Sequence, residues 1–246
     1  ITEIKNIIKL FKDGEMIILV DDEDRENEGD LIISAEHLTA DHINFMITYA
    51  KGLVCAPISS EIAKKLELPL MQGVNNEMQT AYTASVDLKG NGVTTGISAD
   101  DRHKTIKGLL NDNSTRDDFN VPGHIFPLQA MDGGVLRRAG HTEAAIDLCK
   151  LSGHKEVAVI CEIINKDGSM ARMDDLIEFS NEHNIHIGTI KDLIQHRLDS
   201  SNPVEFVSKS KIPTDYGEFT GHVYKDTVDN TEHIALTFGD YLNSKD

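Results

Sequence analysis

The feature that most constrains the fold of this chain is an acidic segment, residues 21–30, in which seven of the ten residues are carboxylates. It lies between two apolar runs, residues 16–20 and 31–33, whose composition is typical of strands. A solvated tail would not be flanked by two runs that require burial, so the pattern predicts two core strands that carry a carboxylate loop to one place. Crowded like charges need a cation, and oxygen ligands favour magnesium or manganese. A solvated turn is the alternative interpretation.

The net charge and the cysteine content narrow the class of partner and the compartment. A formal net charge of −17 opposes nucleic acid or an anionic membrane as the main partner. A few arginines and backbone N–H groups could still hold a small phosphate ester. The three cysteines are scattered, which is typical of a reducing compartment without structural zinc, and Cys55 is expected to pack rather than react. No apolar run approaches the roughly 20 residues that cross a bilayer. We therefore expect a cytoplasmic location, or a plastid one if a leader has been removed.

Helix-like and strand-like patterns alternate through most of the chain, which indicates a layered α/β fold rather than a helical bundle or a β-sandwich. Residues 156–164 form a continuous apolar run and are predicted to be a central strand covered on both faces. Ser98 and Thr142 stand where N-caps are expected, and they predict helices over residues 99–110 and 143–152.

The helical pattern breaks near residues 199–203, where we expect a boundary. It divides a domain of residues 1–199 from a segment of residues 200–246 that is rich in strand-like runs. A hairpin turn is predicted near Asp229 and Asn230. A segment of about 40 residues is too short to bury a core easily, so this part is expected to have little stability of its own.

Three polar residues are candidates for chemistry. Glu162 lies within the central apolar run, where a carboxylate is costly to bury unless it is paired, hydrogen-bonded or protonated, and this favours a functional role. His141 precedes the expected Thr142 cap, where backbone N–H groups and the nearby Arg138 could take a phosphate or an enediolate oxygen. A neutral imidazole there could share the cation of the acidic segment. His124 begins a strand-like run. Each histidine, taken alone, is more commonly structural.

Several segments together resemble the 3,4-dihydroxy-2-butanone-4-phosphate synthase family of riboflavin biosynthesis, over about residues 3–198. They are residues 21–30, 52–55, 93–102, 122–128, 138–144, 161–162 and 168–172. The acidic motif combined with His141-Thr142-Glu143 is the most specific part. With the patterns above, the resemblance implies an α/β (α+β) fold: a layered αβα sandwich with a mixed sheet, plus a short β-rich C-terminal extension.

Members of this family are Mg²⁺-dependent lyases that convert D-ribulose 5-phosphate to L-3,4-dihydroxy-2-butanone 4-phosphate and formate, as homodimers with active sites at the subunit boundary. Carried onto this chain, the resemblance implies that Glu26 and His141 bind Mg²⁺ or Mn²⁺ and that His124 and Glu162 are catalytic. It implies substrate contacts from Arg25, Glu26, Asp30, Arg138, Ala139, Gly140, His141, Thr142 and Glu162. Further candidates are Asp21, Glu28 and Cys55. Ala139 stands where many members have glycine, which reduces backbone freedom without removing a polar side chain.

The C-terminal segment resembles the start of GTP cyclohydrolase II over residues 211–219, 233–236 and 239–240. That enzyme's zinc site requires three clustered cysteines and none follows Cys161, so no cyclohydrolase activity is expected from this chain. A bifunctional protein cut short and a synthase with a vestigial extension both fit this pattern. Two other functions are open: a non-catalytic dimeric scaffold for a cyclohydrolase, and a metal-dependent sugar-phosphate isomerase that shares the enediolate step but releases no formate.

Overall fold

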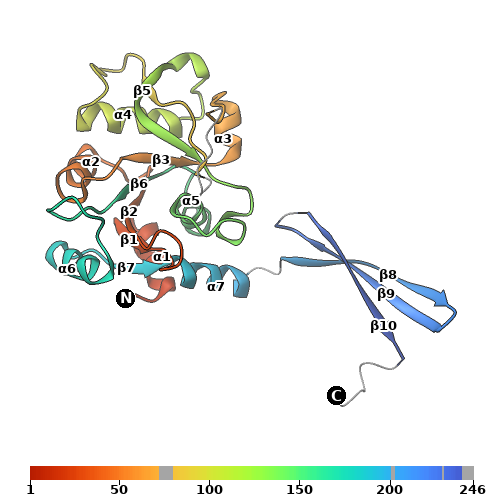
Figure 1. Ribbon diagram of the computed structural model, residues 1–246. Helices are drawn as coiled ribbons and strands as arrows, with labels where there is room; N and C mark the ends of the chain where they lie inside the picture. The colour runs from red at the N-terminus through yellow and green to blue at the C-terminus, as the bar shows by residue number, and fades with distance from the viewer. Residues whose placement is uncertain (72–79, 201–202, 229, 240–246) are drawn as a thin grey trace. The chain divides into compact units, whose positions relative to one another are not determined.

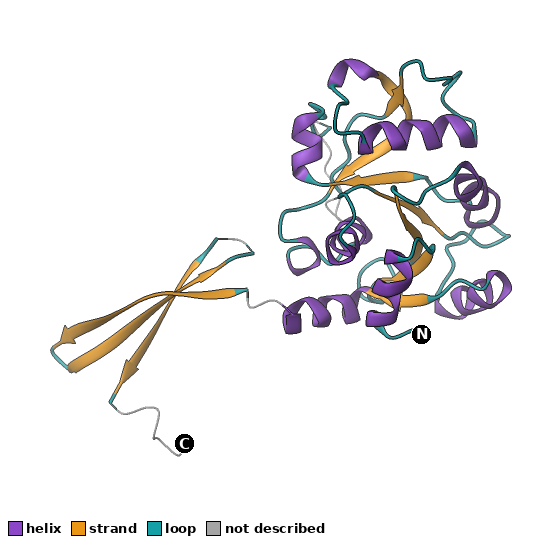
Figure 2. Ribbon diagram, turned by 180° about the vertical axis from the view of Figure 1, so that it is seen from behind, coloured by secondary structure: helices purple, strands orange, loops and turns teal. Residues whose placement is uncertain are grey.

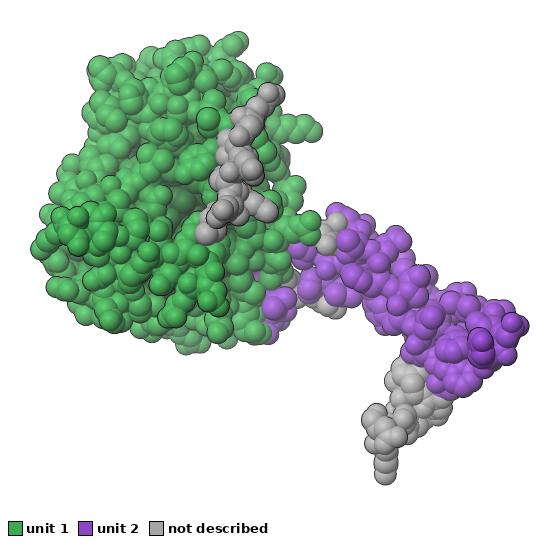
Figure 3. Space-filling model, viewed as in Figure 1, with its two compact units in different colours: residues 1–196 green, residues 197–246 purple. Residues whose placement is uncertain are grey.

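The computed structural model describes residues 1–71, 80–200, 203–228 and 230–239. The chain divides into two compact units, residues 1–196 and residues 197–246, which are coloured separately in Figure 3. No helix in the described part of the chain is both long enough and apolar enough to span a membrane.

The first unit is built on one mixed sheet of seven strands, in the order β4-β5-β3-β6-β2-β1-β7 (Figure 1). The strands are β1 (Ile17–Val20), β2 (Gly29–Ser34), β3 (Cys55–Ile58), β4 (Val86–Leu88), β5 (Phe119–Gln129), β6 (Ala158–Glu162) and β7 (Ile187–Thr189). β6 is the middle strand and residues 158–161 are buried, which confirms the central strand predicted for this apolar run.

Helices cover both faces of this sheet, which confirms the predicted αβα layering (Figures 1 and 2). One face carries α2 (Ala40–Phe45) with its π-helical continuation (Met46–Ala50), α3 (Ser60–Lys65), α4 (Ala99–Leu110) and α6 (Met173–His183). The other face carries α1 (Ile4–Lys12), α5 (His141–Ser152) and α7 (Ile190–Ser200). Strand alternation explains the layers, since Ile18 belongs to the first core and Leu19 to the second.

The register of the sheet brings the acidic segment to the C-terminal end of β6. β2 pairs antiparallel with both β1 and β6, so Asp30 lies opposite Leu19 on one side and Glu162 on the other. The two apolar runs on either side of the acidic segment are therefore neighbouring strands joined by that loop. Asp30 and Glu162, which are far apart in the sequence, therefore become neighbours on adjacent strands.

Two predicted helix starts have different outcomes. Ser98 caps α4 as predicted, because its hydroxyl accepts a hydrogen bond from the N–H of Asp101 at 3.0 Å. The prediction that Thr142 caps the next helix is wrong. The carbonyl of Gly140 accepts the first helical hydrogen bond, so Gly140 is the N-cap of α5 and His141 already lies in its first turn. The Thr142 side chain is buried instead.

The second unit is a three-stranded antiparallel sheet in the order β10-β9-β8. Its strands are β8 (Val204–Thr214), β9 (Gly217–Asp226) and β10 (Glu232–Phe238). This sheet confirms the predicted β-rich extension and a hairpin between β9 and β10. Asp229 lies outside the described residues, as do residues 201–202 at the expected boundary. β8 is exposed along its whole length, in line with the small core expected from so short a segment.

Candidate active site

The acidic segment folds into a compact loop organised by the buried carboxylate of Asp21. Asp21 accepts hydrogen bonds from the N–H groups of Glu26 at 3.2 Å and Glu28 at 2.9 Å, and from the guanidinium of Arg25 at 2.8 Å. Arg25 also donates to Glu26 at 2.8 Å. Residues 22–24 are exposed, whereas Glu26 and Glu28 face a cavity. The segment thus turns only part of its charge toward the cavity, while residues 22–24 face solvent.

A cavity of about 100 Å³ lies where this loop, β2, β6 and the first turn of α5 meet. It is lined by most of the site residues predicted from the sequence: Arg25, Glu26, Glu28, Asp30, Cys55, Arg138, His141, Thr142 and Glu162. Strand pairing brings two of these residues together, since Asp30 of β2 lies opposite Glu162 of β6. The remaining lining residues are Thr80, Tyr82, Leu128 and Ile160, which the sequence patterns did not single out.

A buried histidine faces the carboxylates across this cavity. His141 is 5% exposed, and burial lowers its pKa, so its ring is neutral at neutral pH. Its Nε2 lies 3.2 Å from the carbonyl oxygen of Leu19 and therefore carries the proton. Nδ1 then presents its lone pair to two carboxylates, at 3.9 Å from Glu26 Oε2 and 3.9 Å from Asp30 Oδ1.

The donor atoms around His141 fit a divalent cation. Asp21, Glu26 and His141 each offer a ligand atom, and these atoms lie within 4.8 Å of one another. Asp30 is 3% exposed, and its Oδ1 has no hydrogen-bond partner among the described residues. Burial, followed by the charge of Glu162, raises the pKa of Asp30 well above its ordinary value. Carboxylate oxygens with one neutral imidazole nitrogen suit Mg²⁺ or Mn²⁺, whose charge would relieve this repulsion.

Arg138 brings positive charge to the cavity and is oriented from α5. Its Nη1 donates to Glu143 Oε2 at 2.6 Å, and its Nη2 donates to Thr80 Oγ1 at 3.0 Å. Glu143 is buried and also accepts a hydrogen bond from the N–H of Met131 at 3.1 Å. The position of the guanidinium is therefore set by a buried carboxylate in the first turn of α5.

Thr80 and Tyr82 are site residues that sequence reasoning missed. Thr80 lies at the end of a loop-like stretch and Tyr82 in the strand-like alternation of residues 81–88, and neither belongs to a segment that carries the family resemblance. Burial raises the pKa of Tyr82 to about 12, so its hydroxyl stays protonated. The hydrogen bond from Arg138 to Thr80 joins segments that only the tertiary fold brings together.

Two predicted site residues in the cavity differ in their surroundings. Glu162 is the last residue of β6 and is half-buried, rather than enclosed within the strand as expected. Its Oε2 accepts a hydrogen bond from the N–H of Leu53 at 2.8 Å, which compensates for its partial burial. Cys55 is buried, and burial raises the pKa of its thiol, so the group stays protonated and packs as expected.

The structure does not bring His124 and Ala139 into this cavity within one chain. His124 lies on β5 with 42% of its side chain exposed, and its Nδ1 is 2.7 Å from Asp87 Oδ2. Ala139 is exposed and lines a separate cavity beside α7. Its neighbour Gly140 is buried at the start of α5, where a glycine can contribute backbone alone.

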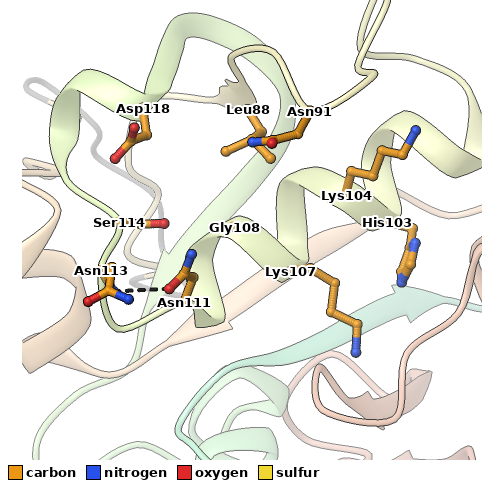
Figure 4. Close-up of a pocket in the computed structure, with 10 residues that line it drawn as sticks. All are labelled: Leu88, Asn91, His103, Lys104, Lys107, Gly108, Asn111, Asn113, Ser114 and Asp118. Atoms are coloured by element: carbon orange, nitrogen blue, oxygen red, sulfur yellow. Dashed lines mark hydrogen bonds between the residues drawn. The ribbon is translucent and has the colours of Figure 1, made fainter.

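A further cavity of about 390 Å³ lies beside α4 and is lined by none of the predicted site residues (Figure 4). Two lysines stand on its wall, and both are engaged in the fold. Lys107 donates to the carbonyl oxygens of Ala35 and Glu36, each at 2.8 Å. Lys104 pairs with Asp100 at 2.6 Å. We assign this cavity no part in the chemistry.

Comparisons with known proteins find two family matches in this chain. A family model described as 3,4-dihydroxy-2-butanone 4-phosphate synthase matches residues 5–196, and one described as GTP cyclohydrolase II matches residues 205–244. Riboflavin biosynthesis protein RibBA of Bacillus subtilis is 48% identical over 238 residues, which are 96% of this chain and 59% of that protein. The 3,4-dihydroxy-2-butanone 4-phosphate synthase of Neisseria meningitidis serogroup A is 47% identical over 240 residues, 97% of this chain and 66% of that protein. The chain thus spans 59% of the length of the RibBA relatives.

Two solved structures share the fold. RibBX, a two-domain 3,4-dihydroxy-2-butanone 4-phosphate synthase from A. baumannii, is 44% identical with a TM-score of 0.92, over 99% of this chain and 72% of that one. A 3,4-dihydroxy-2-butanone 4-phosphate synthase in complex with two magnesium ions is 40% identical with a TM-score of 0.78, over 81% of this chain and 98% of that one.

Proposed function

This chain belongs to the 3,4-dihydroxy-2-butanone 4-phosphate synthase family, and on that basis we propose that it is a lyase of riboflavin biosynthesis. It converts D-ribulose 5-phosphate to L-3,4-dihydroxy-2-butanone 4-phosphate and formate. The observation that carries this proposal is the cavity that gathers Glu26, Asp30 and Glu162 around a neutral His141. Deprotonation beside a ketone, loss of a hydroxyl and expulsion of formate all need proton transfer, which suits such a set of groups.

Glu26 and His141 are the proposed ligands of Mg²⁺ or Mn²⁺. Support comes from the neutral imidazole, whose Nδ1 faces Glu26 at 3.9 Å, and from the relative whose structure is in complex with two magnesium ions. Asp21 is a candidate for a further contact, since its carboxylate belongs to the same cluster. When bound, the cation would act as a Lewis acid that stabilises negative charge on the substrate's oxygens. His141 keeps its Nε2–H on Leu19, so its orientation does not depend on the cation.

The substrate's phosphate is the group most suited to the positive side of the cavity. Arg138 is held there by Glu143, and the first N–H groups of α5, from His141 onwards, add the partial charge of a helix N-terminus. We keep Arg25, Ala139 and Thr142 as proposed substrate contacts, although Ala139 lies outside the cavity. Glu28 and Cys55 stay further candidates because they line its wall.

Glu162 and His124 are the proposed catalytic residues. Glu162 reaches the cavity from the end of β6, with one carboxylate oxygen fixed by the N–H of Leu53. His124 is absent from the lining of that cavity, yet its ring is partly open to solvent. We propose that the protein is a homodimer in which His124 of one chain completes the cavity of the other.

The wider assignments from the sequence also stay proposals. Residues 1–199 are proposed to form the synthase domain and residues 200–246 a GTP cyclohydrolase II-like segment, to which the second family match belongs. The proposed partner is a small sugar phosphate, with no nucleic acid or membrane partner, and the expected location is the cytoplasm, or a plastid.

Incubation of the protein with ribulose 5-phosphate and Mg²⁺ tests the proposal directly, with formate as the readout. Glu26→Gln and Glu162→Gln preserve shape and remove one charge each, and both should abolish or strongly lower formate release. Unchanged activity in Glu26→Gln would overturn the metal assignment, and unchanged kcat in Glu162→Gln would make that residue structural. A five-carbon product without formate would indicate an isomerase instead, and no product at all would indicate a scaffold.

A further inference from the structure

A single buried carboxylate fixes both the ring and the backbone of His124. Asp87 Oδ2 lies 2.7 Å from His124 Nδ1, and Asp87 Oδ1 accepts a hydrogen bond from the N–H of His124 at 2.9 Å. The Asp87 side chain is 11% exposed, whereas the His124 side chain is 42% exposed. The carboxylate is thus enclosed in the fold while the histidine that it holds stays accessible.

The meeting of β4 and β5 is shaped around this pair. The pairing register shifts between Val86 and Asp87, and such irregularities commonly re-aim a side chain. Gly123, next to the histidine, lies so close to β4 that a Cβ would come within 2.3 Å of the backbone nitrogen of Asp87. The backbone geometry therefore directs Asp87 toward His124 from the neighbouring strand.

A glycine closes over the hydrogen bond between the two side chains. A Cβ at Gly96 would lie 2.2 Å from Asp87 Oδ2 and 2.6 Å from His124 Nδ1. Gly96 also has φ +92°, a conformation that favours glycine. Its backbone therefore packs directly against the pair and limits the access of water to it.

The loop that carries Gly96 is in turn anchored by α4. Asp101 Oδ2 accepts hydrogen bonds from the N–H of Gly96 at 3.1 Å and the hydroxyl of Thr94 at 2.8 Å. Asp101 Oδ1 accepts from the N–H of Thr94 at 3.1 Å. One buried carboxylate thus holds the loop against the carboxylate–histidine pair.

We propose that Asp87 is a positioning residue that holds His124 with its proton on Nδ1, so that Nε2 presents a lone pair to the substrate. An ionised carboxylate can only accept a hydrogen bond, which makes Nδ1 the donor. The negative charge of Asp87 also stabilises the imidazolium that forms when Nε2 takes a proton. The inference rests on the proposed catalytic role of His124, and nothing in it requires Asp87 to touch the substrate.

Asp87→Asn tests this assignment because it keeps the shape and one acceptor. The amide oxygen can still accept from the N–H of His124, while the NH₂ group would face Nδ1 and favour the tautomer with the proton on Nε2. We expect kcat to fall on the order of 10³–10⁴-fold, as for a tautomer-setting carboxylate, with KM changed less than about threefold. The matched control is Asp118→Asn, since Asp118 caps the turn before β5 without contacting His124, and it should keep near-normal kcat.

The tautomer itself can be measured without any activity. Two-bond ¹H–¹⁵N correlation spectra of ¹⁵N-histidine-labelled protein distinguish the two tautomers, and the His124 signal is assigned by its loss in His124→Gln. We expect the Nδ1–H form in wild type and the Nε2–H form in Asp87→Asn. An Nε2–H form in wild type, or near-normal kcat in an Asp87→Asn variant with a switched tautomer, would overturn the proposal. If wild type releases no formate, the proposed function fails, whereas the spectrum still decides whether Asp87 sets the tautomer.

Discussion

Asp21→Asn is the most direct test of how the acidic loop is stabilised. Asp21 is buried and its two oxygens serve different partners. Oδ1 accepts from the N–H of Glu28 at 2.9 Å, and Oδ2 accepts from the N–H of Glu26 at 3.2 Å and from Arg25 at 2.8 Å. An asparagine can reproduce the first contact. Its NH₂ group, placed at Oδ2, would confront two other donors.

The expected loss follows from the contacts that this substitution removes. Each hydrogen bond to a charged group contributes about 1.5–3 kcal/mol, and the substitution removes two such bonds. Arg25 keeps its contact with Glu26 at 2.8 Å, so its guanidinium is not left alone. We therefore expect the free energy of unfolding of the metal-free protein to fall by about 3 kcal/mol, toward the low end for a broken buried pair.

This loss is measured by urea unfolding of the metal-free protein, with far-UV circular dichroism as the probe. The matched control is Asp22→Asn, because Asp22 is exposed and bonds locally to the N–H of Asp24 at 2.9 Å. The control should change the free energy of unfolding by less than about 0.5 kcal/mol. If Asp21→Asn were equally mild, Asp21 would not organise the loop, and the acidic segment would have to be held by its strands alone.

Four further outcomes are expected. Mg²⁺ at 100 times its Kd should raise the free energy of unfolding by about 2.7 kcal/mol, and Glu26→Gln should lose most of this gain; an equal gain in the variant would exclude Glu26 as a ligand. Mixed and refolded His124→Ala and Glu26→Gln chains should recover part of the formate production, because one hybrid cavity is intact; hybrid dimers without activity would refute a shared site. Burial lowers the pKa of His42, whose Nδ1 accepts from the N–H of Thr39 at 3.2 Å. The contribution of this histidine to the free energy of unfolding should therefore be complete above the ordinary pKa of 6.5 and be lost as pH falls through the lowered pKa. The free energy of unfolding, measured in urea at a series of pH values, should vary less with pH in His42→Gln, and an equal pH dependence would show that His42 is not responsible. A chain shortened to end at Asp199 should keep formate production and Mg²⁺ dependence, and the chain of 246 residues should release no formate from GTP. Loss of formate production on shortening, or release of formate from GTP, would refute the proposed role of the C-terminal segment.

Local sequence determined the elements that build the site. Two apolar runs around residues 21–30 were enough to predict two strands and a carboxylate loop, because strand burial depends on composition over a few residues. The apolar run of residues 156–164 predicted the central strand β6 for the same reason. The resemblance, carried by motifs within these elements, indicated that Glu26 and His141 would share a site, and the cavity contains both.

Tertiary structure alone decided which groups meet and how they are oriented. Asp30 lies opposite Glu162 because β2 pairs with β6, and such long-range register cannot be read from either strand. The same holds for Thr80, which binds Arg138, and for Asp87, which is brought to His124 by the pairing of β4 with β5. Periodicity reports which face of an element is buried, whereas hydrogen-bond partners and proton positions depend on distances between segments that only the packed chain sets.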